Sequence, residues 1–121
     1  MVNSRAKGCR GERDWRDVLR ANGYPNARRG QQFSGTETTE DVVGGPVGFH
    51  CEVKDRKAHN VWNAMQQAEH DSGGRAVPYV AMRSPRKPWL VVLRAEDFLA
   101  LLAKLPVARG AGDLGDADRP L

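Results

Sequence analysis

The chain has 121 residues, enough for one hydrophobic core, so we expect a single domain. Its net charge is +4, and residues 1–36 hold eight Arg and Lys side chains against three acidic ones, which favours a polyanionic partner, although a GC-rich coding sequence also enriches arginine. The apolar runs are too short for a membrane span or secretion signal, and the two cysteines lack zinc-site or disulfide-framework spacing, so we expect a cytoplasmic protein.

The first expected element is a helix that follows a flexible arm. Residues 1–8 are polar and basic, which is typical of an arm. Apolar residues recur at helical spacing from Trp15 to Leu19 and predict a helix over 9–22. Glu12 lies on or beside the apolar face, where an unpaired charge is costly, unless it is simply a first-turn residue favoured by the helix dipole.

Three short strands are expected next. Residues 27–33 predict a polar first strand, and residues 34–39 have the hydroxyl and glycine content of a loop. Two β-rich runs, 40–43 and 49–54, then flank a Gly-Pro turn. These two runs predict a hairpin or a pair of neighbouring strands.

A second helix and two further strands follow. The apolar pattern that starts at Val61 predicts a helix ending at Ser72-Gly73-Gly74. Residues 77–82 and 89–93 are apolar and bounded by turn residues, so they predict central strands covered on both faces.

A third helix and a tail complete the chain. Residues 95–105 predict a helix whose apolar face must dock, and residues 106–121 have the composition of a disordered tail. We therefore expect an α/β domain over residues 1–105 with the order α-β-β-β-α-β-β-α. Its central mixed β-sheet would have about five strands flanked by helices.

The candidate site lies on the run 49–54. Side chains alternate along a strand, so His50, Glu52 and Lys54 share one face. If the two β-rich runs pair, Asp41 reaches the same corner as Glu52. Two carboxylates and a lysine at a strand end could hold a hard divalent cation and steer a phosphate. A half-exposed strand also carries alternating charges without any such role, so the pattern leaves both interpretations open.

Four motifs occur in one order and at short spacings. They are Lys7-Gly8-Cys9-Arg10-Gly11-Glu12-Arg13, Arg28-Arg29-Gly30-Gln31-Gln32-Phe33-Ser34-Gly35, Asp41-Val42-Val43 and Glu52-Val53-Lys54. Together they resemble the Holliday-junction resolvases of the PD-(D/E)XK nuclease superfamily, particularly small phage-type and archaeal-type members. The resemblance covers residues 5–102 and implies a restriction-endonuclease-like fold.

The resemblance implies a role for each candidate site residue. Asp41 and Glu52 would ligate Mg²⁺, for which Mn²⁺ would substitute. The backbone carbonyl of Val53 and the side chain of Glu12 would complete this metal site. Lys54 would position or activate the attacking water and offset charge on the phosphate. The implied catalytic residues are Glu12, Asp41, Glu52 and Lys54.

The resemblance also implies contacts with DNA. The expected DNA-binding residues are Arg13, Arg28, Arg29, Ser34 and Gln67. On a helix, Gln67 is equally well explained as solvated surface. His50 shares a strand face with Glu52 and is interpreted as a lining or surface residue, and His59 and His70 have no partner at metal-site spacing, so we assign none of the three a role.

The implied activity is Mg²⁺-dependent hydrolysis of DNA phosphodiester bonds by an endodeoxyribonuclease that resolves four-way junctions, in the bacterial host cytoplasm if the gene is from a phage. A junction has two symmetric strands to cut, so we expect a homodimer. The third helix, Trp89 and Val91 or Leu93 are candidate interface material, although each is equally explained as core. We expect no membrane partner and no small-molecule cofactor.

Two other functions stay open. One is a nicking or duplex nuclease of the same superfamily, acting in phage DNA processing or restriction. The other is a non-catalytic DNA-binding module in which Glu52 and Lys54 are an ordinary charged pair.

Overall fold

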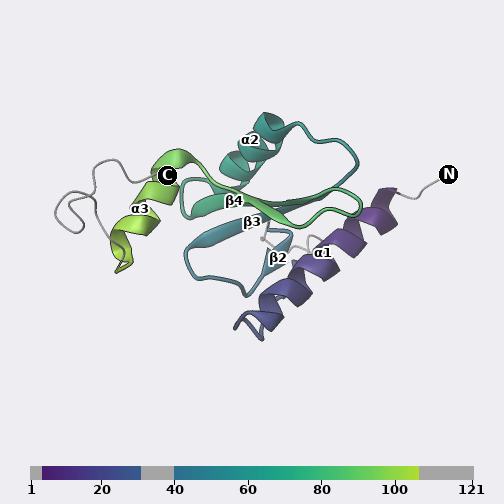
Figure 1. Ribbon diagram of the computed structural model, residues 1–121, viewed down its shortest axis with the longest axis horizontal. Helices are drawn as coiled ribbons and strands as arrows, with labels where there is room; N and C mark the ends of the chain where they lie inside the picture. Colours follow the sequence, from purple (N-terminus) through teal and green to yellow (C-terminus); the bar gives the residue numbers. More distant parts are fainter. Residues whose placement is uncertain (1–3, 31–39, 107–121) are drawn as a thin grey trace, which may run out of the picture.

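The computed structural model describes the backbone of residues 4–30 and 40–106 and the side chains of residues 9–30 and 40–106. The elements are α1 (Ser4–Ala21), β1 (Arg28–Arg29), β2 (Val42–Val43), β3 (Phe49–Asp55), α2 (Val61–Ser72), β4 (Val77–Arg83), β5 (Leu90–Val92) and α3 (Ala95–Lys104). Figure 1 shows their arrangement. The predicted order of helices and strands is confirmed.

The five strands form two hydrogen-bonded ladders. Strands β3, β4 and β5 make a mixed sheet in that order, with β3 parallel to β4 and β4 antiparallel to β5. Strands β1 and β2 make a separate antiparallel pair, which lies beside the free edge of β3. The β3–β4 register pairs Glu52 with Val80, which puts the candidate site strand next to the most buried strand of the sheet.

The two ladders are joined by side chains in place of a continuous backbone ladder. The side chains of Glu40 and Asp41 accept hydrogen bonds from the backbone N–H groups of Cys51 and Val53. Only one backbone bond joins the two segments among the described residues, from the Asp41 N–H to the Cys51 carbonyl. Carboxylate oxygens therefore accept the hydrogen bonds from β3 that backbone carbonyls of a neighbouring strand would accept in a continuous sheet.

Helices α1 and α2 cover opposite faces of the three-stranded sheet (Figure 1). Trp15 of α1 is buried among side chains that include Val53 and Tyr79. Its indole Nε1 donates to the Tyr79 hydroxyl at 3.1 Å. On the other face, Met65 of α2 packs against Val80. Burial on both faces explains why β4 is nearly continuous in apolar residues.

Helix α2 ends as the sequence predicts. Gly73 follows the last helical residue with a φ of 60°, a left-handed conformation that glycine adopts without strain. Its backbone N–H donates to the His70 carbonyl, which satisfies one of the free carbonyls at the helix end.

Close contact between α1 and β3 depends on a glycine. A Cβ atom at Gly11 would lie 2.7 Å from the Cβ of Asp55, too close for two carbon atoms. Arg83 of β4 fixes the same contact, because its Nη2 atom bonds Asp14 of α1 at 2.8 Å and Asp55 of β3 at 2.7 Å. The helix and the strand are thus held at a short separation.

Three expectations about the elements are wrong. The helix α1 begins at Ser4, so residues 4–8 are helical and do not form a flexible arm. Strand β5 is an edge strand, not a central one, and Leu90 and Val91 are 60% and 52% exposed. Helix α3 docks only part of its apolar face on the described part of the chain, since Leu101 and Leu102 are half-buried whereas Phe98 and Leu99 are exposed.

Much of the apolar side of α3 is exposed. None of its residues, all of which the structure describes, is buried, and Phe98 and Leu99 are 50% and 61% exposed. The helix lies at the end of the molecule away from α1 (Figure 1), tethered by an ion pair between Arg94 and Glu69 of α2. No described helix is long and apolar enough to cross a membrane. The expected tail lies outside the described residues apart from Pro106.

Candidate active site

Asp41 is held at the free edge of β3 by backbone hydrogen bonds. Its Oδ2 atom accepts from the Val53 N–H at 2.8 Å, and its own N–H donates to the Cys51 carbonyl at 3.0 Å. The N–H and C=O of one strand residue point to the same side, so the Val53 carbonyl also faces this edge. The edge therefore brings together a carboxylate and a backbone carbonyl.

Glu52 lies next to Asp41 and is almost completely buried, with 3% of its surface exposed. Burial, followed by the negative charge of Asp41, raises the pKa of Glu52 to about 8. Burial also raises the pKa of Asp41, against the opposing effect of the hydrogen bond from Val53. The two carboxyl groups hydrogen-bond to each other, with Glu52 retaining the proton.

Glu12 reaches the same region from α1. Its Oε1 atom accepts a hydrogen bond from Arg29 Nε of β1 at 2.9 Å. Burial raises the pKa of Glu12, the bond to Arg29 opposes this, and the charge of Asp41 adds to the increase. The carboxylates of Glu12 and Asp41 are therefore close enough to repel each other.

Lys54 supplies the positive charge of this site. Its charge lowers the pKa of both Asp41 and Glu52. Its Nζ atom donates to Gln67 Oε1 of α2 at 2.8 Å, so α2 holds the amine in place. The two residues line a cavity of about 150 Å³ whose other walls include Arg56, His59, Asn60 and Asn63.

Crowded carboxylates at this edge suit a divalent cation. Three acidic groups have raised pKa values, and Glu52 Oε2 is buried without a hydrogen-bond partner among the described residues. A cation would compensate the negative charge and give that oxygen a ligand role. Because Glu12, Asp41, Glu52 and the Val53 carbonyl offer only oxygen atoms, they suit a hard ion.

The expected DNA-binding residues that the structure describes differ in exposure. Arg13 and Arg28 are exposed, and Arg28 Nη1 donates only to the Asn26 carbonyl at 3.2 Å among the contacts of the described residues. Arg29 is occupied by Glu12 and also donates to Cys9 Sγ at 2.9 Å. Ser34 lies outside the described residues.

A solved structure of Hjc, a Holliday junction resolvase from the archaeal hyperthermophile Archaeoglobus fulgidus, is similar to this chain, with 29% sequence identity and a TM-score of 0.52. The similarity covers 69% of this chain and 73% of the Hjc chain. The predicted resemblance to Holliday junction resolvases is confirmed. The restriction-endonuclease-like fold is confirmed with it. No protein-family model and no curated protein matches the chain.

The resolvase-like chain also carries a cluster that the sequence did not reveal. One ligand atom each of His50, Glu52 and Asp71 lie within 4.8 Å of one another. Alternation along β3 placed His50 on the same face as Glu52, but nothing in the sequence linked either residue to Asp71 of α2. Asp71 reaches the cluster because it lies in the last turn of α2, which packs on β3 and β4.

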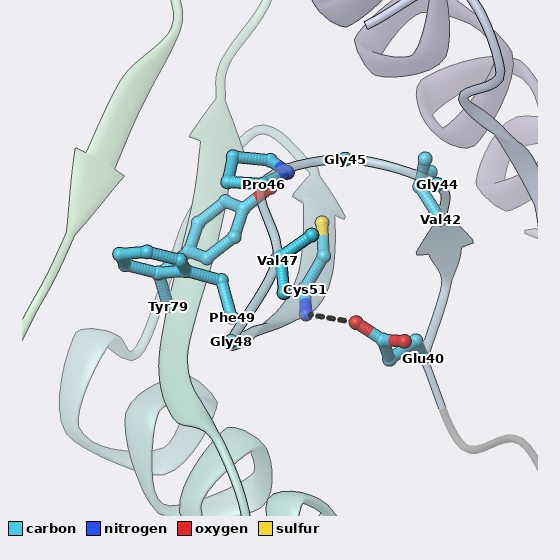
Figure 2. Close-up of a pocket in the computed structure, with 10 residues that line it drawn as sticks. All are labelled: Glu40, Val42, Gly44, Gly45, Pro46, Val47, Gly48, Phe49, Cys51 and Tyr79. Carbon is cyan, nitrogen blue, oxygen red and sulfur yellow. Dashed lines mark hydrogen bonds between the residues drawn. The ribbon is translucent and has the colours of Figure 1, made fainter.

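A second cavity of the resolvase-like fold carries no reactive group. It has a volume of about 260 Å³ and lies between the turn after β2 and the strands β3 and β4 (Figure 2). Figure 2 shows Glu40 reaching across to the backbone N–H of Cys51. Burial raises the pKa of the Cys51 thiol to about 12 and also raises the pKa of Tyr79, so both groups are neutral near pH 7. The candidate chemistry therefore belongs to the carboxylate edge.

Proposed function

We propose that this protein is a metal-dependent, structure-selective DNA endonuclease that resolves four-way junctions by paired phosphodiester hydrolysis. The observation that carries the proposal is the grouping of three carboxyl groups, those of Glu12, Asp41 and Glu52, at the free edge of β3. Burial raises the pKa of each group, and the charge of Asp41 further raises the pKa values of Glu12 and Glu52. The similarity to Hjc supports the choice of substrate.

In this proposal, Asp41, Glu52, Glu12 and the Val53 carbonyl hold Mg²⁺, and Mn²⁺ substitutes for it. When bound, such an ion supplies positive charge to the phosphate and makes a nearby water more acidic. Lys54 places a second positive charge beside the phosphate and positions the attacking water, while Gln67 orients the Lys54 amine.

The DNA backbone is bound by basic and polar groups around this edge. Arg13 and Arg28 are exposed and suited to contacts with phosphates, and Arg29 is paired with Glu12. Ser34 and Gln67 complete the proposed set. Arginine suits this task because its planar fork binds phosphate oxygens in pairs.

Paired cleavage requires two active sites, which a homodimer would provide. The exposed apolar residues of β5 and α3 support this assembly, since a partner chain that covers them would remove apolar surface from water. These residues are Leu90, Val91, Phe98 and Leu99.

Cleavage of matched DNA substrates tests the proposed function. The purified protein is incubated with Mg²⁺ and with either an immobile four-way junction or a linear duplex of the same sequence. We expect symmetric nicks confined to the junction. Asp41→Asn and Glu52→Gln should each lower the cleavage rate by about 10²-fold or more, because each removes charge from the reacting centre. Glu96→Gln on α3 is the matched control and should cut at the wild-type rate.

The same assay distinguishes the two alternatives. Equal cutting of junction and duplex would indicate a nicking or duplex nuclease of the same superfamily. If Asp41→Asn and Glu52→Gln behave as wild type toward DNA and Mg²⁺, the protein is a binding module without catalytic activity.

A further inference from the structure

A second group of potential ligands lies beside the carboxylate edge, between β3 and the last turn of α2. It consists of His50, Glu52 and Asp71, which offer ligand atoms within 4.8 Å of one another. Ligand atoms that share an ion at 2.0–2.2 Å lie up to about 4.4 Å apart. A small side-chain rotation therefore brings all three onto one ion.

Two of these three side chains are buried with unsatisfied atoms. His50 and Glu52 are only 5% and 3% exposed. His50 Nε2 and Glu52 Oε2 have no hydrogen-bond partner among the described residues. A buried polar atom without a partner is costly, and a bound ion is one way in which a native protein satisfies such an atom. A closed network of hydrogen bonds within the cluster would not leave these atoms free.

The charge of the cluster also suits a cation. Two of the three ligands are carboxyl groups, which together bring a charge of −2 once both are ionised as metal ligands, and a divalent ion neutralises that charge. The charge of Asp71 raises the pKa of Glu52, so the two acidic groups repel each other without an ion between them.

The imidazole decides which ions fit. Mg²⁺ prefers an all-oxygen shell, whereas imidazole nitrogen suits first-row transition metals. We propose that His50, Glu52 and Asp71 form a second cation site that selects a transition-metal dication over Mg²⁺. Two of its three ligands, His50 and Asp71, lie outside the proposed Mg²⁺ site, so the proposal does not rest on the proposed nuclease function.

The site has a consequence for Glu52, which it shares with the carboxylate edge. A transition metal bound by His50 and Asp71 keeps the Glu52 carboxylate ionised, because a cation stabilises the charged form. An ion in this site therefore keeps Glu52 negatively charged on the side where it faces the carboxylate edge.

Mn²⁺ binding in excess Mg²⁺ tests the proposal without any DNA. Mn²⁺ is the probe because it binds most weakly among the first-row divalent ions, so its retention in excess Mg²⁺ is the most stringent test of selectivity. Electron paramagnetic resonance of free Mn²⁺ gives the number of ions bound per chain. Broadening of the His50 ring signals in NMR spectra locates the ion.

We expect one Mn²⁺ per chain to stay bound in excess Mg²⁺ and to broaden the His50 signals. His50→Gln and Asp71→Asn should each weaken binding at least about tenfold. His70→Gln is the matched control, because His70 is an exposed histidine next to Asp71, and it should bind as wild type. Asp71 is only partly buried, so Asp71→Asn still tests the site if His50→Gln does not fold, as judged by circular dichroism.

Three results would overturn the proposal. They are displacement of every bound Mn²⁺ by Mg²⁺, a loss of affinity in His70→Gln as large as that in His50→Gln, and wild-type binding of Mn²⁺ by Asp71→Asn. Each result is obtained whether or not the protein cleaves junctions.

Discussion

At the scale of residues, the candidate site concentrates negative charge in a buried place. Glu52 is the extreme case, since its pKa rises from an ordinary 4.5 to about 8 through burial and then through Asp41. Lys54 opposes this increase but does not cancel it. The metal-free protein therefore carries an electrostatic cost that grows as its carboxyl groups ionise.

This cost predicts how stability varies with pH in the absence of metal. Glu52 binds its proton more tightly in the folded protein than in the unfolded chain, so its contribution is fully present below pH 4.5 and is lost as the pH rises through about 8. Glu12 and Asp41 act in the same direction, because their pKa values are also raised. With a chelator present, the free energy of unfolding measured in urea should fall between pH 5 and pH 8, because this interval lies between the ordinary and the raised pKa of Glu52.

Glu52→Gln should flatten this dependence and stabilise the metal-free protein at pH 8, since an amide does not ionise. The exposed control Glu96→Gln should follow the wild-type curve. Stability that rises over this interval in the wild type would contradict the pH dependence derived from the buried carboxyl groups.

The sequence predicted part of this site, and geometry explains the rest. Alternation along β3 placed Glu52 and Lys54 together because it is a local rule. The contacts of Lys54 with Gln67 and of Glu12 with Arg29 join different elements, so no local pattern could predict them. The grouping of Asp71 with β3 depends likewise on how α2 packs.

At the scale of elements, the docking of α1 decides where Glu12 lies. Trp15 is the buried anchor of that helix, with its ring 5.2 Å from the Trp89 ring and its N–H bonded to Tyr79. Helical spacing predicted the element and its buried face correctly. It could not predict the partner, because periodicity says that a face is apolar and not what covers it.

Loss of the indole should loosen this docking. Trp15→Phe removes the hydrogen bond to Tyr79 and leaves part of the ring volume unfilled, so it should lower the free energy of unfolding by about 1–3 kcal/mol. Urea unfolding followed by circular dichroism measures this change. Trp62→Phe is the matched control, because Trp62 is 84% exposed, and its effect should stay within about 0.5 kcal/mol. Equal effects of both substitutions would show that Trp15 is not an anchor.

The same limit of periodicity explains the two errors at the other end of the chain. Residues 89–93 and 95–105 have apolar patterns, and we expected both to be covered within the chain. In the structure, β5 is at an edge, and no residue of α3 is fully buried, with Phe98 and Leu99 largely exposed. The predicted five strands also form two ladders, because the acidic side chains of Glu40 and Asp41 compete with backbone carbonyls as acceptors on β3.

At the scale of the whole molecule, the exposed side of α3 and β5 predicts self-association. Leu99 is 61% exposed, and a charge at this position would have to be desolvated in an apolar interface. Leu99→Asp should therefore raise the dimer dissociation constant about 30-fold or more, as measured by analytical ultracentrifugation.

Val47→Asp is the control for this experiment. Val47 is 98% exposed but belongs to another element, the turn after β2, so its substitution should leave the dimer intact. A monomeric wild-type protein at high concentration would argue against the homodimer. Junction cleavage by such a monomer would also remove the reason for proposing paired sites within one particle.

The glycine between Arg10 and Glu12 has a consequence for tolerance to mutation. At Gly11, α1 and β3 approach so closely that a single methyl group meets Asp55, which Arg83 prevents from moving aside. Any side chain there would push the helix outward and carry Glu12 away from Asp41. In a saturation library, this position should thus be as intolerant as the carboxylates themselves, although it has no functional group to lose.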